Sequence, residues 1–176
     1  FSGKSPAGES VDFTNYYLRK NGRPMFGISG EFHFSRCREE CWEDELEKMR
    51  LCGINIIATY TFWNHHEEKE GEFCFEGRRN LRRFVTLCQE KGFYVIVRIG
   101  PFVHGEVRNG GLPDWLYGKP FEVRENNEGF LSCTRRLYRK LAEQLSGLFY
   151  QEGGPVIGVQ IDNEYQHSAA PWEMTA

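Results

Sequence analysis

The feature that most constrains the fold is an alternation of short, almost wholly apolar runs with longer segments of helical periodicity. Apolar runs occupy residues 54–60, 93–99 and 156–161, and we expect a further strand in the segment near Ile28. Strands that are buried on both faces have such sequences, whereas half-exposed strands alternate apolar and polar residues. Strand–helix–strand units with buried strands predict a parallel sheet.

The segments between these runs carry apolar residues at helical spacing. Trp42, Leu46 and Met49 fall at i, i+4 and i+7, with acidic residues early and basic residues late. Two further helices are expected after Asn80 and around 130–148. We count about four strand–helix units, while a complete barrel needs ~250 residues. The prediction is the N-terminal portion of a (β/α)8 TIM barrel. A doubly wound sheet is the alternative, weakened because no GxGxxG or Walker sequence opens a helix.

The first residues differ from the rest of the chain. Residues 11–18 are rich in β-forming types, Asn21-Gly22 is a type I′ turn signal, and a strand is expected to resume over 24–28. We therefore expect a short β-hairpin in residues 1–23. Residues 24–176 are expected to form an incomplete barrel, with the remainder beyond residue 176. Phe1 is not an initiator, which indicates a processed chain or an excerpt of a longer protein.

Composition narrows the class of partner. The chain has 176 residues, of which 40% are hydrophobic, so it can build one sizeable core. A net charge of -3 offers no excess of positive charge for binding nucleic acid. No apolar run reaches the ~20 residues that cross a bilayer. The six cysteines form no CxxC pair, and the sequence has no Asn-x-Ser/Thr acceptor. This favours a cytoplasmic protein, with a secreted form as the alternative.

Polar and aromatic side chains recur just beyond the predicted strands. Each alone is typical of an ordinary loop carboxylate or a structural histidine, but together they indicate a site, because the carboxyl ends of parallel strands meet at one edge. Aromatic faces cover the apolar side of a sugar, while carboxylates and amides bind its hydroxyls. The candidates are Glu31, His33, Tyr60, Trp63, His65, His66, Glu67, His104, Glu106, Asp162, Asn163 and Glu164.

Glycoside hydrolysis needs two carboxyl groups, one of them protonated. Glu164 follows a predicted buried strand beside Asn163, and burial there favours the protonated form that an acid requires. A metal site is disfavoured, because His65 and His66 are adjacent and no HExxH occurs. No cofactor is expected.

Seven stretches of the chain form a recognisable series of motifs, at 30–36, 42–55, 59–67, 98–102 with Glu106, 110–116, 153–155 and 160–165. Through these motifs the chain resembles, over nearly its whole length, family thirty-five of the glycoside hydrolases, the β-galactosidase family. The resemblance implies a (β/α)8 catalytic domain, retention of anomeric configuration and release of terminal β-galactose.

The resemblance also implies roles for single residues. Glu164 resembles the general acid/base, and Asn163 the residue that holds the sugar 2-hydroxyl. Tyr60 and Glu106 resemble residues that bind galactose hydroxyls. The family's nucleophile is a glutamate on a later strand, beyond this sequence. The full set of expected substrate-binding residues is Tyr60, Glu106, Asn163, His104, Gly105 and Trp63.

Three positions depart from the family pattern. His104-Gly105 stands where Cys-Ala is frequent, Asp162 replaces a common glutamate, and Gln166 replaces a usual glycine. These departures put the preferred sugar in doubt more than the reaction type. A β-glucosaminidase or β-glucosidase of the same fold is therefore one rival, and a non-catalytic carbohydrate-binding or scaffold fragment is another.

The expected partner is a β-galactoside or oligosaccharide, with no nucleic acid and no membrane. Half a barrel leaves open sheet edges, so the segment alone is expected to be inactive and prone to associate. A homo-oligomer is therefore one expected form of the protein.

Overall fold

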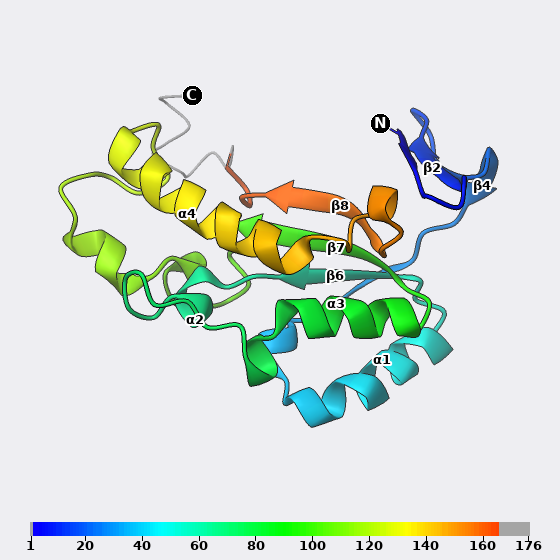
Figure 1. Cartoon of the computed structure of the whole chain (residues 1–176), viewed down its shortest axis with the longest axis horizontal. Coiled ribbons are helices and arrows are strands. Elements are labelled where there is room, and N and C mark those ends of the chain that lie inside the picture. Colours follow the sequence, from blue (N-terminus) through cyan, green and yellow to red (C-terminus); the bar gives the residue numbers. More distant parts are fainter. Residues whose placement is uncertain (1, 166–176) are drawn as a thin grey trace.

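The structure, a computed structural model, describes residues 2–165 and contains an antiparallel sheet followed by a parallel sheet with helices (Figure 1). In the antiparallel sheet the order β1-β2-β3-β4 follows the chain. Its strands are Ser2–Lys4 (β1), Ser10–Phe13 (β2), Leu18–Lys20 (β3) and Arg23–Met25 (β4).

This antiparallel sheet corrects the expectation for the N-terminal segment. A strand was expected through residues 11–18, but Thr14 ends it, because its hydroxyl accepts the N–H groups of Tyr16 and Tyr17 in a turn. Asn21 and Gly22 then join β3 to β4 with φ of 51° and 75°, the positive values that a type I′ turn requires. The segment is thus four strands rather than two, and the boundary expected after residue 23 falls inside β4.

The parallel sheet has the order β5-β6-β7-β8, again the order of the chain. Its strands are Ser29–Glu31 (β5), Ile56–Tyr60 (β6), Tyr94–Gly100 (β7) and Val156–Ile161 (β8). The helices are Trp42–Leu51 (α1), Trp63–His66 (α2), Leu81–Glu90 (α3) and Glu128–Leu145 (α4). Short 3-10 turns lie at Phe34–Arg36, Glu39–Cys41, Gly77–Arg79, Arg108–Gly111, Asp114–Gly118 and Tyr150–Glu152.

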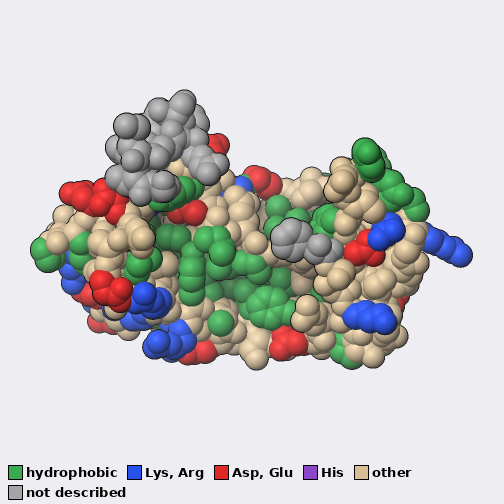
Figure 2. Space-filling model, turned by 90° about the horizontal axis from the view of Figure 1, so that it is seen from above, with side chains coloured by type: hydrophobic (Ala, Val, Ile, Leu, Met, Phe, Trp, Pro, Cys, Tyr) green, Lys and Arg blue, Asp and Glu red, His purple; other side chains and the backbone are tan. Residues whose placement is uncertain are grey.

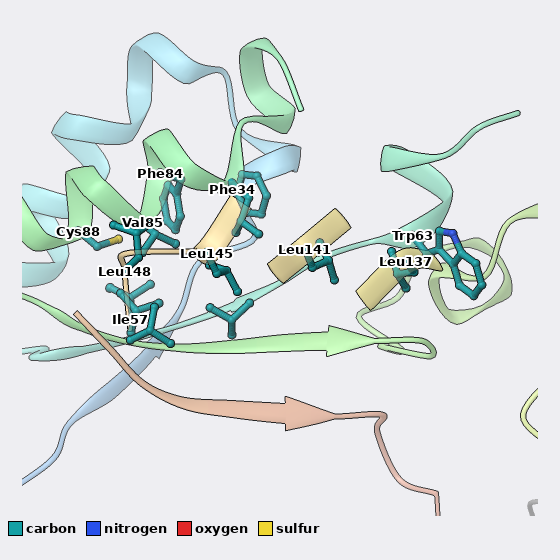
Figure 3. Packing of buried hydrophobic residues seen from close by; sticks show 14 of the residues in the cluster. Phe34, Ile57, Trp63, Phe84, Val85, Cys88, Leu137, Leu141, Leu145 and Leu148 are labelled. Carbon is teal, nitrogen blue, oxygen red and sulfur yellow. The ribbon is translucent and has the colours of Figure 1, made fainter. Parts of the chain in front are cut away.

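The core lies between the helices and one face of the parallel sheet. Ile57, Val95 and Val97 form this helix-facing side, and side chains of α1, α3 and α4 pack against it (Figure 3). Asn80 and Asn127 cap α3 and α4 by accepting backbone N–H groups, which satisfies donors that a helix start leaves unpaired.

The opposite side of the sheet, here called the inner face, carries polar residues. Register sets this placement, because paired residues in parallel strands point to the same side. Glu31 pairs with Ala58, Tyr60 with Arg98, and Arg98 with Gln160. These side chains therefore gather on the face that α1, α3 and α4 leave uncovered, near the carboxyl ends of the strands.

The face around β8 is apolar and open. Figure 2 shows apolar side chains gathered on the face seen from above β8. On β8, Val159 and Ile161 are 42% and 69% exposed. A cavity of about 350 Å³ lies between β8 and the antiparallel sheet, with Val11 and Phe149 among its lining residues. No helix in residues 2–165 is long and apolar enough to cross a membrane.

Candidate active site

Tyr60, Glu31 and His33 form the first part of the site, at the ends of β5 and β6. The Tyr60 hydroxyl donates to the Glu31 carboxylate, and the His33 ring packs on the Tyr60 ring with centroids 4.4 Å apart. Burial and then the bond to Glu31 raise the pKa of Tyr60 to about 12. The hydroxyl therefore stays protonated. Because its one proton goes to Glu31, its oxygen is left to accept a hydrogen bond from a ligand.

Two arginines, Arg98 and Arg36, hold the loop after β7 against Tyr60 and His33. The guanidinium of Arg98 lies 3.7 Å from the centre of the Tyr60 ring and donates to the Val103 carbonyl at 2.9 Å. Arg36 donates to the backbone carbonyl of Glu106 at 2.9 Å and bonds His33 Nδ1 at 3.2 Å. Burial and the Arg36 charge lower the pKa of His33, which keeps its ring neutral near pH 7.

The loop that carries His104, Gly105 and Glu106 is tightly shaped. All three residues have left-handed backbone, with φ of 60°, 61° and 48°. A Cβ on Gly105 would lie 2.8 Å from the Phe62 ring, so only glycine fits there. The Glu106 carboxylate and the His104 ring are exposed, and their nearest atoms are 3.9 Å apart. Both side chains are thus open to a ligand above the inner face.

The segment after β8 carries the expected acid. Asp162 and Glu164 have left-handed backbone, with φ of 56° and 49°. The Asn163 amide oxygen is 3.4 Å from the Gln160 side-chain nitrogen, which donates to it. Glu164 is exposed, so the burial expected for it is absent within the described residues.

Trp63 is not brought to the site, contrary to expectation. Its side chain is 0% exposed, and its indole N–H donates to the buried carboxylate of Glu67 at 2.6 Å. The ring packs edge-on against Trp115 and lies in the helix-side core with Leu137 (Figure 3). It has no free face for a sugar. His66 is likewise buried in this core, and its Nδ1 bonds the Cys74 carbonyl at 3.1 Å.

Three arginines of the site, Arg36, Arg98 and Arg124, have no role assigned from the sequence, although Arg36 and Arg98 lie within the motifs at 30–36 and 98–102. Arg98 interrupts an otherwise apolar strand, and a charge in such a run signals a partner on the same face. Nothing comparable distinguishes Arg36 or Arg124. Within residues 2–165, no cluster of three or more His, Cys, Asp and Glu side chains is arranged to hold a metal ion.

Comparison with solved structures shows which fold the chain has. The fold resembles a β-galactosidase from the psychrophilic Marinomonas ef1, with a TM-score of 0.61 at 19% identity over 81% of this chain and 22% of that one. It also resembles the exo-β-1,4-mannosidase Op5Man5 from an Opitutaceae bacterium, with a TM-score of 0.63 at 16% identity over 98% and 28%. The chain thus has the α/β fold, with a parallel sheet, that is found in glycoside hydrolases of TIM-barrel type.

Sequence comparison gives the family. The model of glycosyl hydrolases family 35 matches residues 17–174, and the chain belongs to this family. It is 41% identical to β-galactosidase 14 of Arabidopsis thaliana over 92% of the chain and 18% of that protein. It is 37% identical to the β-galactosidase of Canis lupus familiaris over 89% and 24%. The chain therefore spans less than a quarter of the length of either relative.

Proposed function

We propose that this chain is the N-terminal part of the catalytic (β/α)8 barrel of a retaining β-galactosidase. The observation that carries the proposal is the Asn163-Glu164 pair at the carboxyl end of β8 in a chain of family 35. The sequential order of β5 to β8 supports a barrel, because the strand order of a doubly wound sheet reverses at its switch point.

The proposed reaction has two steps. Glu164 protonates the glycosidic oxygen while a glutamate from a later part of the protein attacks the anomeric carbon. Glu164 then removes a proton from water, which releases the sugar from the covalent intermediate. The two carboxyl groups of a retaining enzyme lie ~5–5.5 Å apart, so the later glutamate must face Glu164 across the sugar.

The inner face offers complementary groups for the sugar. Tyr60 presents an oxygen acceptor, and the Glu106 carboxylate accepts from sugar hydroxyls in the exposed position described above. Asn163 is proposed to bind the 2-hydroxyl. His104 and Gly105 are proposed to contact the sugar through their backbone. In this proposal Trp63 supports the site from the core instead of touching the sugar.

The test uses the full-length protein and three aryl glycosides, a β-galactoside, a β-glucoside and a β-N-acetylglucosaminide. We expect the galactoside to have the highest kcat/KM, and NMR to detect β-galactose before it mutarotates. A first-formed α-anomer would contradict retention. A preference for another sugar would favour the rival exo-β-glycosidase, and absence of hydrolysis of all three would favour a non-catalytic protein.

A further inference from the structure

We propose that Arg124 is a positioning residue that fixes the segment from Asp162 to Glu164, and with it the carboxyl group of Glu164. This inference rests on the proposed function, because it assigns Arg124 a role through the acid/base. Arg124 lies in the loop before α4, far along the chain from the residues that it would hold.

The segment needs support because its backbone is strained. Left-handed backbone is costly for non-glycine residues and persists where the surroundings determine it. Asp162 tolerates it better than most, since its Oδ1 accepts the N–H of Asn163 at 2.7 Å. Glu164, at φ 49°, has no such local bond among those of the described residues. In this proposal the support for its conformation comes from Asp162 and Asn163, the two residues before it.

Arg124 holds Asp162 and Asn163 in place through hydrogen bonds. Its guanidinium donates to Asp162 Oδ1 at 2.5 Å and to the Asn163 carbonyl at 2.9 Å. The side chain is only 2% exposed, and its guanidinium carbon lies 3.8 Å from the centre of the Phe102 ring. A single nitrogen, Nη2, thus bonds both the Asp162 side chain and the backbone carbonyl immediately before Glu164.

The support continues into α4, which makes it rigid. Asn127 caps α4 by accepting the N–H of Phe130, and it also donates to the Glu122 carbonyl at 2.8 Å, which ties the Arg124 loop to the helix. A second link runs through the Gly100 carbonyl, which accepts both the Tyr138 hydroxyl of α4 and the Asp162 N–H. The position of Glu164 is therefore set by α4 and β7 together.

Stability alone does not explain this buried pair. Burial raises the pKa of Asp162 and lowers the pKa of Arg124, in each case against the attraction between the two charges. The desolvation of both charges offsets their attraction, so a buried ion pair is a weak source of stability. Its geometry, which joins a loop to the residues beside the proposed acid, fits a positioning role.

The experiment compares Arg124→Met, Asp162→Asn and the double variant in the full-length protein. Each single variant removes one half of the Arg124–Asp162 ion pair and is expected to lower both Tm and kcat. The double variant removes both charges, so its Tm should recover. If Arg124 positions Glu164, the double variant still loses about 100-fold in kcat for a galactoside with a poor leaving group, and much less for an activated aryl galactoside. KM should change little.

Arg124→Lys provides a milder control, because it keeps the charge but removes the planar guanidinium that lies over the Phe102 ring. We expect a Tm near that of the unmodified protein and an intermediate, leaving-group-dependent loss of kcat. Recovery of both Tm and kcat in the double variant would overturn the proposal, as would equal losses across leaving groups.

Glu164→Gln, measured in parallel, distinguishes failure of the positioning role of Arg124 from failure of the acid/base assignment of Glu164. If its loss depends on the leaving group and the Arg124 variants' loss does not, only the positioning role is overturned. If Glu164→Gln itself shows no dependence, the acid/base assignment and the positioning role are both overturned.

Discussion

At the scale of single residues, the site is built from polar groups that lie against aromatic rings. Tyr60 is 4% exposed and is enclosed by the His33 ring on one side and the Arg98 guanidinium on another. Only its hydroxyl is aimed at a polar partner, Glu31. The ring thus belongs to a small core, whereas the hydroxyl is available for recognition.

Tyr60→Phe should therefore weaken galactose binding about tenfold, which corresponds to the loss of one good hydrogen bond. The Glu31 side chain is 57% exposed and can be hydrated instead, so we expect a small change in Tm. The measurements are the inhibition constant for galactose and thermal unfolding. Tyr94→Phe is the control, because Tyr94 pairs with Ile56 at the opposite end of the strands. Unchanged affinity with a large loss of Tm would assign Tyr60 to the core alone.

His66 predicts how stability depends on pH. Burial lowers the pKa of His66 to about 4, against an ordinary value of 6.5. Between these values the unfolded chain binds a proton that the folded chain does not, so stability rises with pH across this window and is lost as the pH falls. The loss between pH 6.5 and 4 should be roughly 3 kcal/mol from this group.

Denaturant unfolding at a series of pH values checks this dependence. His66→Asn keeps a donor near the Cys74 carbonyl but does not titrate, so the variant should lose much of the slope across this window. A slope equal to that of the unmodified protein would show that other groups cause the acid sensitivity.

The residues of the site could be predicted only in part from the sequence. The ends of the strands were recognisable, so Glu31, Tyr60 and the 162–164 segment could be placed at one edge of the sheet. Trp63 was misplaced, because an aromatic residue after a strand can turn either toward a ligand or back into the core. Arg124 could not be found, since its partners lie far away in the chain and are joined to it only by the fold.

At the scale of elements, the buried carboxylate of Glu67 connects the segment after β6 to α4. It accepts from the Trp63 indole at 2.6 Å, the Gly71 N–H at 2.7 Å and the Arg136 guanidinium at 2.8 Å. Its own backbone carbonyl accepts from the Trp115 indole at 3.0 Å. Removing the carboxylate would leave the Trp63 indole and the Gly71 N–H without this acceptor, and would leave Arg136 only its longer ion pair with Glu70 at 3.7 Å.

Glu67→Ala should accordingly lower the free energy of unfolding by roughly 3–5 kcal/mol. Glu68→Ala is a matched control, because the neighbouring Glu68 is 70% exposed and pairs with Arg79 on the surface. That pair should contribute no more than about 1 kcal/mol. Urea unfolding of the two variants provides the comparison, and similar costs would refute the connecting role of Glu67.

The elements of the parallel sheet were predictable because their periodicity is strong. The apolar runs at 54–60, 93–99 and 156–161 match β6, β7 and β8 to within two residues at each end, and the helical spacing at Trp42 marks α1. The antiparallel sheet was only partly predictable. Its strands have three or four residues, too few for a period of two to be distinguished from a turn.

At the scale of the whole molecule, the described residues leave apolar surface beside an edge strand. Within residues 2–165, β8 is the last strand of the parallel sheet, and a single bridge from Val156 to Phe149 is its contact beyond β7. Val159 and Ile161 of β8 are 42% and 69% exposed. Such edges favour pairing with other chains.

The 176-residue chain expressed alone should therefore associate or aggregate and show no glycosidase activity. Light scattering measures the association, and the double variant Val159→Lys/Ile161→Lys should reduce it, because charge on an exposed edge opposes pairing. A stable monomer that hydrolyses a β-galactoside at ordinary rates would contradict the half-barrel account.

The central claim, that Glu164 is the acid/base of a retaining galactosidase, is tested most directly by its leaving-group dependence. In the full-length protein, Glu164→Ala should lower the glycosylation rate by roughly 100-fold or more for an alkyl β-galactoside, whose departing oxygen needs the proton. A dinitrophenyl β-galactoside, whose leaving group is already stable, should lose far less in this step. Added azide should then raise its turnover and yield β-galactosyl azide, because azide attacks the intermediate without a general base. Equal losses for both substrates, with no effect of azide, would contradict the claim.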